Sequence, residues 1–217
     1  MIDVEVLADA GAVAARAADE VAARISGVAA AAPYTFAVSG GSTPWAMFAE
    51  LAAHDVPWER VAIYQVDERV APAEDADRNL THLMASLPPG LATIHAMPVE
   101  DADLEAAAGR YAASLPERFD LIHLGLGPDG HTASLVPGDP VLEVTDRDVG
   151  LTEPYQGHRR MTLTYPALDR AGGVLWLVTG EAKVDALARL RAGDRSIPAG
   201  RVRAASQLVL CDRAATG

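Results

Sequence analysis

The chain has 217 residues, half of them hydrophobic, which suits one α/β domain with a substantial core. Its formal net charge of -12 repels nucleic acid and anionic membranes, so neither is an expected partner. The single cysteine, Cys211, excludes an intrachain disulfide; with no signal-peptide pattern and no apolar run of roughly 18 residues, the sequence favours a cytoplasmic protein.

Helix and strand patterns alternate along the first half of the chain. In order, they predict a helix at 9–32, a strand at 34–39, a helix at 44–53, a strand at 61–66, a helix at 78–86, a strand at 93–97 and a helix at 101–115. Thr43 is the expected cap of the second helix, with Pro44 in its first turn.

The second half continues the alternation, with strands predicted at 119–124, 149–152, 161–164, 174–179 and 207–211 and a helix at 181–191. Residues 119–124 form a continuous apolar run, as expected for a strand whose two faces are both covered. The sequence therefore predicts one domain over residues 1–217, with a three-layer, Rossmann-like fold. Its sheet is mostly parallel and carries helices on both faces.

Polar and glycine-rich segments follow four of these strands, at 39–43, 67–69, 125–131 and 180–183. Ligands of such sheets bind beyond the carboxyl ends of the strands, so a site is expected where these segments meet.

The first of these segments has the character of an anion-binding loop. Gly40 and Gly41 let the backbone approach a ligand, and the hydroxyls of Ser42 and Thr43 join free amides at a helix N-terminus. A tight turn with a capping threonine is the alternative, but the preceding strand and Pro44 favour phosphate or sugar binding. No Gly-Lys-Ser/Thr follows, which excludes the phosphate loop of nucleotide hydrolases.

Residues 125–130 match Gly-x-Gly-x-x-Gly, the dinucleotide-binding pattern. That pattern needs a helix after the glycines, and Pro137 and Pro140 interrupt the following segment. Glu153 stands at a tolerable distance for a ribose-binding acid. A nicotinamide-dependent oxidoreductase therefore stays open as a weaker alternative.

His131 ends this loop and is the candidate general base, because an imidazole that titrates near neutral pH suits the activation of water. Asp129, two residues earlier, is placed to orient it. His123 lies inside the strand and is interpreted as a core residue with a satisfied nitrogen.

Charged residues supply the candidate substrate contacts. In the triplet Asp67-Glu68-Arg69, the carboxylates would bind sugar hydroxyls and Arg69 an anion. Arg160, preferred over its neighbour Arg159, and Lys183, the only lysine, are further candidates for the anion. The chain has no Gly-x-Ser-x-Gly elbow and no His/Cys metal motif, so neither a serine nucleophile nor a metal is expected.

Together these residues resemble the 6-phosphogluconolactonase family. The matching segments are in family order and cover nearly the whole chain: Ser39–Pro44, Val66–Val70, Gly125–Leu135, Arg160–Thr164 and Gly180–Lys183. The resemblance implies the isomerase-type fold of glucosamine-6-phosphate deaminases, ribose-5-phosphate isomerase and CoA transferases. It also implies hydrolysis of 6-phospho-D-glucono-1,5-lactone, the second step of the oxidative pentose phosphate pathway.

The roles that follow from the resemblance are expectations. The 40–43 loop would bind the 6-phosphate, with charge from Arg69, Arg160 or Lys183. His131 would deprotonate the attacking water, while Gly130 and the other loop glycines would provide donors near the substrate. No cofactor is expected, and the protein would be a monomer or a small homo-oligomer.

One departure and two further alternatives remain. Family members often have Ser-Asn where this chain has Arg78-Asn79, and Arg78 is either an added phosphate contact or a tolerated helix-start residue. A deaminase or aldose-ketose isomerase is the first alternative. Deaminases usually continue Ile-Ala-Phe-Asn-Glu-Pro after the shared Asp-Gly-His, and residues 132–137 lack that Asn-Glu pair. The second is a sugar-phosphate-sensing regulator, which would normally carry a partner module.

Overall fold

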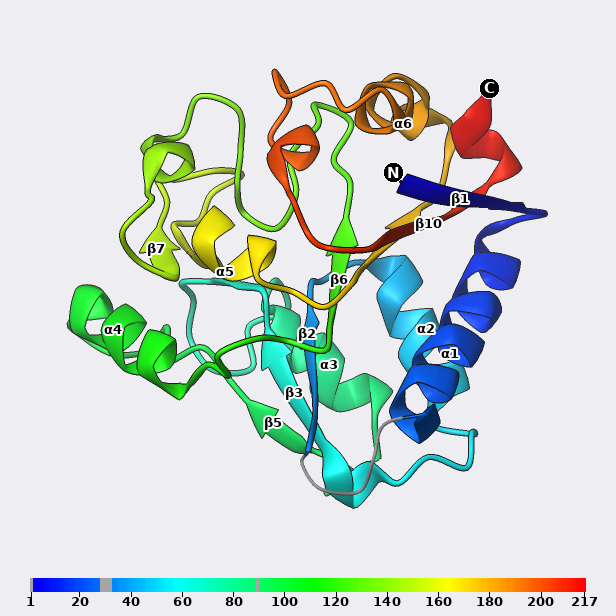
Figure 1. Ribbon diagram of the computed structural model, residues 1–217. Coiled ribbons are helices and arrows are strands. Elements are labelled where there is room, and N and C mark those ends of the chain that lie inside the picture. The colour runs from blue at the N-terminus through cyan, green and yellow to red at the C-terminus, as the bar shows by residue number, and fades with distance from the viewer. Residues whose placement is uncertain (1, 28–32, 89) are drawn as a thin grey trace.

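A parallel sheet runs through the computed structural model, which describes residues 2–27, 33–88 and 90–217 (Figure 1). Its seven strands are all paired in parallel. Their order across the sheet is β1 (Ile2–Leu7), β10 (Gln207–Asp212), β9 (Val174–Val178), β6 (Leu121–Gly125), β2 (Tyr34–Val38), β3 (Val61–Gln65) and β5 (Thr93–His95). The predicted α/β fold class is confirmed.

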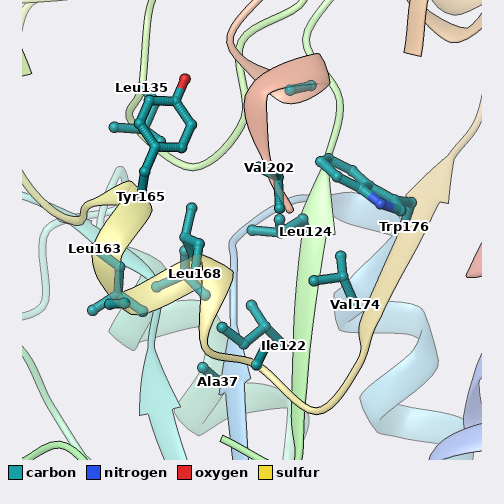
Figure 2. Packing of buried hydrophobic residues seen from close by; sticks show 14 of the residues in the cluster. Ala37, Ile122, Leu124, Leu135, Leu163, Tyr165, Leu168, Val174, Trp176 and Val202 are labelled. Carbon is teal, nitrogen blue, oxygen red and sulfur yellow. The ribbon is translucent and has the colours of Figure 1, made fainter. Parts of the chain in front are cut away.

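The central strands are mainly apolar because both of their faces are buried. In β2, Phe36 and Val38 pack into the core on one side of the sheet, and Ala37 packs into the core on the other. On the side of Ala37, Figure 2 shows Ile122 of β6 between Leu168 and Val174 of β9. Side chains that alternate between two cores give each strand the continuous hydrophobic run seen in the sequence.

Helices cover both faces of the sheet (Figure 1). One core contains side chains of α1 (Ala10–Gly27), α2 (Ser42–Leu51) and α3 (Asn79–Ser86). The other contains side chains of α4 (Leu104–Ser114), α5 (Tyr165–Asp169) and α6 (Val184–Arg191). Short 3-10 turns lie at Trp58–Arg60, Pro140–Glu143, Glu181–Lys183, Ala199–Arg201 and Arg213–Thr216. Within the described residues, no helix is both long and apolar enough to cross a bilayer.

A second, smaller sheet packs on the α4 side of the molecule. Its antiparallel strands are β4 (Asp67–Arg69), β8 (Arg160–Leu163) and β7 (Val149–Leu151), in the order β4-β8-β7. Met161, Leu163 and Val149 anchor it in the same core as α4. The sequence predicts 67–69 only as a charged segment after a strand, so pairing of Arg69 with Arg160 across this sheet is a finding of the structure.

Several predicted helix boundaries differ from the structure, among them those of the first two helices. The first helix ends at Gly27, and residues 28–32 of the predicted segment lie outside the described residues. The second begins at Ser42, so Gly41, and not Thr43, is its N-cap residue. Gly41 has φ 137°, a backbone conformation that side chains strongly disfavour, which explains why glycine ends the loop.

The strand order changes direction at the centre of the sheet. From β2 the chain moves outward to β3 and β5, whereas from β6 it moves the other way to β9 and β10. The crevice beyond the carboxyl ends of β2 and β6 is therefore the topological switch point, where ligands of α/β sheets bind. The four polar segments expected from the sequence follow β9, β6, β2 and β3, which are neighbours in this sheet.

Candidate active site

A cavity of about 280 Å³ opens at this switch point. Nine of the twelve predicted site residues line it: Gly40, Gly41, Ser42, Thr43, Asp67, Arg69, His131, Arg160 and Lys183. The other three, Glu68, Asp129 and Gly130, do not line it. The structure thus brings the 40–43 turn and the imidazole of residue 131 to one cavity.

The loop after β2 is held by contacts that require its glycines. A Cβ atom on Gly40 would lie 1.9 Å from Asn79 Oδ1, so only glycine fits against that amide. The hydroxyls of Thr43 and Thr179 are hydrogen-bonded at 2.9 Å, which joins this loop to the one that follows β9. The Ser42 and Thr43 amides open α2, where backbone N–H groups have no partner within the helix.

The imidazole of His131 is fixed by Asp129. The carboxylate Oδ1 lies 2.6 Å from His131 Nδ1 and also accepts the backbone N–H of residue 131 at 3.1 Å. Burial opposes ionisation of this carboxyl, but the hydrogen bonds and charge of His131 lower the pKa of Asp129 below its ordinary value. Because Nδ1 faces a carboxylate, it carries the ring proton, and Nε2 keeps its lone pair.

Glycines shape the loop around this pair. A Cβ atom on Gly127 would lie 2.1 Å from His131 Nδ1, so the ring packs directly against the backbone there. Gly130 has φ 84°, and a Cβ atom on it would lie 2.5 Å from the Cβ of Ile197. Gly130 therefore allows the turn that places His131. Asp129 does not line the cavity and contacts the imidazole at Nδ1.

Tyr155 was not anticipated from the sequence. Its ring lies edge-on to that of His131, with centroids 5.7 Å apart, and the guanidinium of Arg160 stands 5.1 Å from the Tyr155 centroid. The residue comes from the connection between β7 and β8, which carried no motif. Tyr155 links the candidate base to the candidate anion-binding arginine.

Arg160 is buried without an acidic partner. Its side chain lies on β8 opposite Arg69 of β4, and the residue is 5% exposed. Its nitrogens reach only neutral oxygens, Ser134 Oγ at 3.5 Å and Gln156 Oε1 at 3.4 Å, and no carboxylate of the described chain forms an ion pair with it. Burial lowers the pKa of Arg160, against the opposing effect of Asp67. A buried guanidinium that forms no ion pair within the protein is suited to bind an anionic ligand from solution.

Arg69 and Lys183 add two more cations to the cavity. Arg69 Nη1 donates to Asn79 Oδ1 at 2.9 Å and also to the backbone carbonyl of Asp77. The ammonium of Lys183 forms no hydrogen bond or ion pair with the described part of the chain, and burial lowers its pKa although the charge of Asp129 raises it. In a chain of net charge -12, this local concentration of positive charge favours an anionic ligand.

Asp67 is the only acidic side chain that lines the cavity within the described residues. Its Oδ2 accepts the hydroxyl of Ser134 at 2.6 Å, and Asn79 Nδ2 donates to its backbone carbonyl at 2.9 Å. Burial raises the pKa of Asp67, opposed by the Ser134 hydrogen bond and by the nearby arginines. The carboxylate is therefore rigidly placed to accept a hydroxyl hydrogen bond.

Glu68 does not line the cavity but holds together two elements that do, β4 and the start of α3. The residue is fully buried, and its carboxylate accepts four hydrogen bonds of 2.8 Å, from the backbone amides of Arg69, Asn79 and Leu80 and from the Gln65 side chain. It thus caps the start of α3 and fixes β4 to it.

Arg78 also lies outside the cavity. Its guanidinium is 3.3 Å from Glu68 Oε2 and 2.7 Å from Glu100 Oε1. Of the two interpretations of Arg78, the structure therefore favours a residue at the helix start over a phosphate contact.

His123 lines the cavity, which the sequence did not predict. The residue is fully buried as expected, and its Nδ1 accepts the backbone N–H of Ser39 at 3.3 Å. Its Nε2 has no hydrogen-bond partner in the described structure. Burial lowers the pKa of His123 to about 3. A polar side chain inside an otherwise apolar strand, two residues before Gly125, was the signal available in the sequence.

The dinucleotide-binding alternative lacks structural support. After Gly125 the chain forms a loop that reaches the 3-10 turn at Pro140–Glu143, so residues 125–130 open no helix that could receive a pyrophosphate. Among the described residues, no group of three or more His, Cys, Asp or Glu side chains is arranged to hold a metal ion.

Comparison with known proteins agrees with this geometry. Residues 8–210 match the family model described as glucosamine-6-phosphate isomerases/6-phosphogluconolactonase. A 6-phosphogluconolactonase of Rhizobium meliloti (strain 1021) is 39% identical over 209 residues, which cover 88% of this chain and 90% of the relative.

Solved structures of this family share the fold of the chain. A 6-phosphogluconolactonase from Thermotoga maritima superposes with a TM-score of 0.87 at 26% identity, over 98% of this chain and all of the other. A monomeric glucosamine-6-phosphate deaminase superposes with a TM-score of 0.85 over 98% of each chain; at 18% identity, it shows the shared fold alone.

Proposed function

The chain belongs to the glucosamine-6-phosphate isomerase/6-phosphogluconolactonase family, and from this premise we propose that it hydrolyses 6-phospho-D-glucono-1,5-lactone to 6-phospho-D-gluconate. This is the second step of the oxidative pentose phosphate pathway. The observation that carries the proposal is a single cavity that holds a carboxylate-bound imidazole together with three cationic side chains, Arg69, Arg160 and Lys183.

The 6-phosphate binds between the 40–43 loop and the cations. The amides at the start of α2 and the hydroxyls of Ser42 and Thr43 donate to phosphate oxygens. Arg160 and Lys183 supply the charge, since neither has an acidic hydrogen-bond partner in the described chain. Asp67 accepts a hydrogen bond from a hydroxyl of the sugar.

His131 is the general base. Its Nε2 takes a proton from water, whose oxygen attacks the lactone carbonyl carbon. The resulting imidazolium is stabilised by Asp129 through Nδ1–H. Backbone N–H groups of the glycine loops or an arginine stabilise the oxyanion, each worth about 3 kcal/mol. The carbon–oxygen ring bond then breaks, and the ring oxygen leaves with the proton held at Nε2.

This route needs no metal and no cofactor, because water is activated by the imidazole and the oxyanion by fixed donors. All the residues that this mechanism uses come from one chain, so the proposal is compatible with a monomer and with a small homo-oligomer. The proposal includes a cytoplasmic location and excludes nucleic acid and membranes as partners.

A deaminase of the same fold is the competing function. In this chain, residues 132–137 place the Ser134 hydroxyl on Asp67, with no Asn-Glu pair in the segment. That arrangement favours the lactonase.

The test is a coupled assay with freshly made 6-phosphoglucono-1,5-lactone, corrected for spontaneous hydrolysis. Turnover of this substrate is expected well above that of the unphosphorylated lactone. Ammonia release from glucosamine 6-phosphate is measured in parallel. Absence of lactone turnover, or release of ammonia at a comparable rate, would overturn the proposal.

A further inference from the structure

Buried polar atoms without a partner gather at the cavity. Six such side-chain atoms occur in the described structure, and four of them belong to residues that line the cavity: Ser39 Oγ, Arg69 Nε, His123 Nε2 and Arg160 Nε. A buried polar group without a hydrogen bond is costly, so such a concentration marks a place where a ligand completes the hydrogen bonding. Two of these atoms, in His123 and Ser39, have no role in the proposed mechanism.

His123 and Ser39 form one unit at the floor of the cavity. His123 stands in β6, whose neighbouring residues Ile122 and Leu124 belong to the core on the α4 side. Successive side chains of a strand point to opposite faces, so the His123 ring lies on the α2 side, beneath the loop after β2. The backbone N–H of Ser39 donates to His123 Nδ1 at 3.3 Å, which ties the ring to the first residue of that loop.

This hydrogen bond determines the tautomer of the ring. A nitrogen that accepts a backbone N–H carries no proton, so the neutral imidazole must hold its proton on Nε2. Nε2 is thus a donor, and it has no acceptor in the described chain. His131 has the opposite arrangement, with its proton on Nδ1 and a lone pair on Nε2.

The ring also stays uncharged throughout the physiological range. His123 is fully buried, and three cations already line the cavity, so a second proton on the ring is disfavoured by desolvation and by repulsion. Its pKa of about 3 agrees with this. A neutral N–H donor differs from the arginines and the lysine because it offers direction without net charge.

We infer that His123, as the neutral Nε2–H tautomer, donates a hydrogen bond to an oxygen of the substrate bound in the cavity. The inference rests on the proposed function, since it concerns the same site and a phosphorylated sugar lactone. It makes His123 a residue that positions the substrate relative to His131. The sugar's position then depends on an uncharged contact as well as on its phosphate.

Two variants separate this role from a structural one. In His123→Asn, the side-chain oxygen still accepts from Ser39 N–H, but the donor at the Nε2 position is lost. In His123→Gln, an N–H donor reaches that position, while the acceptor for Ser39 is lost. We expect His123→Asn to keep the melting temperature close to wild type and to lower kcat/KM about three- to tenfold, the range for one neutral hydrogen bond. His123→Gln is expected to retain kcat/KM within about threefold, with a lower melting temperature. The reverse pattern would overturn the inference.

A second measurement does not depend on how the variants fold. In 15N-histidine-labelled wild-type protein, the His123 ring is expected to show a protonated Nε2 and no titration between about pH 5 and 8. Added 6-phosphogluconate is expected to shift that Nε2–H signal saturably. A proton on Nδ1, or a signal unmoved at saturating product, would overturn the inference.

The wild-type assay keeps the two proposals apart. Lactone turnover by the wild-type enzyme together with an unmoved His123 signal would remove the role of His123 and leave the lactonase assignment standing. No turnover by the wild-type enzyme would instead remove the lactonase assignment.

Discussion

Two walls of different construction line the cavity. One wall, the loop wall, comes from β6 and from the loops that follow the parallel strands, and it offers backbone amides, hydroxyls and two imidazoles, in residues 39–43 and in His123 and His131. The other comes from the small antiparallel sheet and its connections, and it offers fixed charges, Asp67, Arg69 and Arg160.

The difference shows how one cavity can bind an anion and also hold a general base. The loop wall places its imidazoles by hydrogen bonds, to Asp129 in one case and to Ser39 in the other. The charged wall places its arginines by strand register, since Arg69 and Arg160 are paired across β4 and β8. Loss of the general base in the loop wall should therefore mainly lower turnover, whereas loss of an arginine in the charged wall should mainly weaken substrate binding.

The largest effect is expected from His131→Ala. It should lower kcat by about 10²–10⁴-fold, the loss for a general base, while the fold is retained. His54→Ala is the matched control, because that histidine pairs with exposed Asp19 and does not line the cavity. Steady-state kinetics and a thermal melt measure both. Near-normal turnover of His131→Ala would show that this imidazole is not the general base.

Glu68→Gln should destabilise the charged wall, because Glu68 supports β4 through buried hydrogen bonds. An amide in place of this fully buried carboxylate cannot accept from all four donors and leaves Arg78 with less compensation, so the free energy of unfolding should fall by about 3 kcal/mol. Glu100→Gln is the control, since Glu100 pairs with the same Arg78 at the surface and should cost under about 1 kcal/mol. Equal losses in urea unfolding would contradict the role given to Glu68.

Arg160→Ala tests whether the charged wall binds the phosphate. It should raise KM for the phosphorylated lactone roughly 10- to 100-fold, as expected for one hydrogen bond to a charged group, and change kcat little. Arg159→Ala is the matched control, because the neighbouring arginine is exposed and lies outside the cavity. An unchanged KM in Arg160→Ala, with wild-type inhibition by inorganic phosphate, would place the phosphate elsewhere.

The smallest effect concerns stability and pH in the loop wall. His131 lowers the pKa of Asp129, so this pair stabilises the fold above the unfolded-state pKa of about 3.9 and the stabilisation is lost as the pH falls through the folded-state value. Asp129→Asn should therefore be less stable than wild type at pH 7, by under about 1 kcal/mol because the pair is partly exposed. The difference should shrink in strong acid; a difference independent of pH would argue against the pairing.

The two walls also differ in how far the sequence predicts them. Ser39–Pro44 and Gly125–His131 are contiguous segments after strands, so their place at the edge of the sheet followed from local pattern and the rule for parallel sheets. Glu68 and Arg78 could not be assigned in the same way. In the sequence, both charges suggest contact with solvent or a ligand. In the structure both side chains are buried at the start of α3, where Arg78 pairs with Glu68 and with the distant Glu100.

His123 shows the same limit inside the better-predicted wall. Its burial in a strand followed from the sequence, but which of its nitrogens is bonded did not. That depends on Ser39, a residue brought to it only by the pairing of β2 with β6.

The order of hydrophobic and glycine-rich segments determined the fold class, a site beyond the carboxyl ends of the strands and the candidate base, because strands, helices and tight turns depend on local periodicity and backbone freedom. Tertiary structure decided which of the charged candidates line the cavity. Arg69 and Arg160 are 91 positions apart, and only antiparallel pairing of β4 with β8 sets them side by side. Contacts between distant segments leave no local pattern, since each residue type is compatible with several environments until the chain has folded.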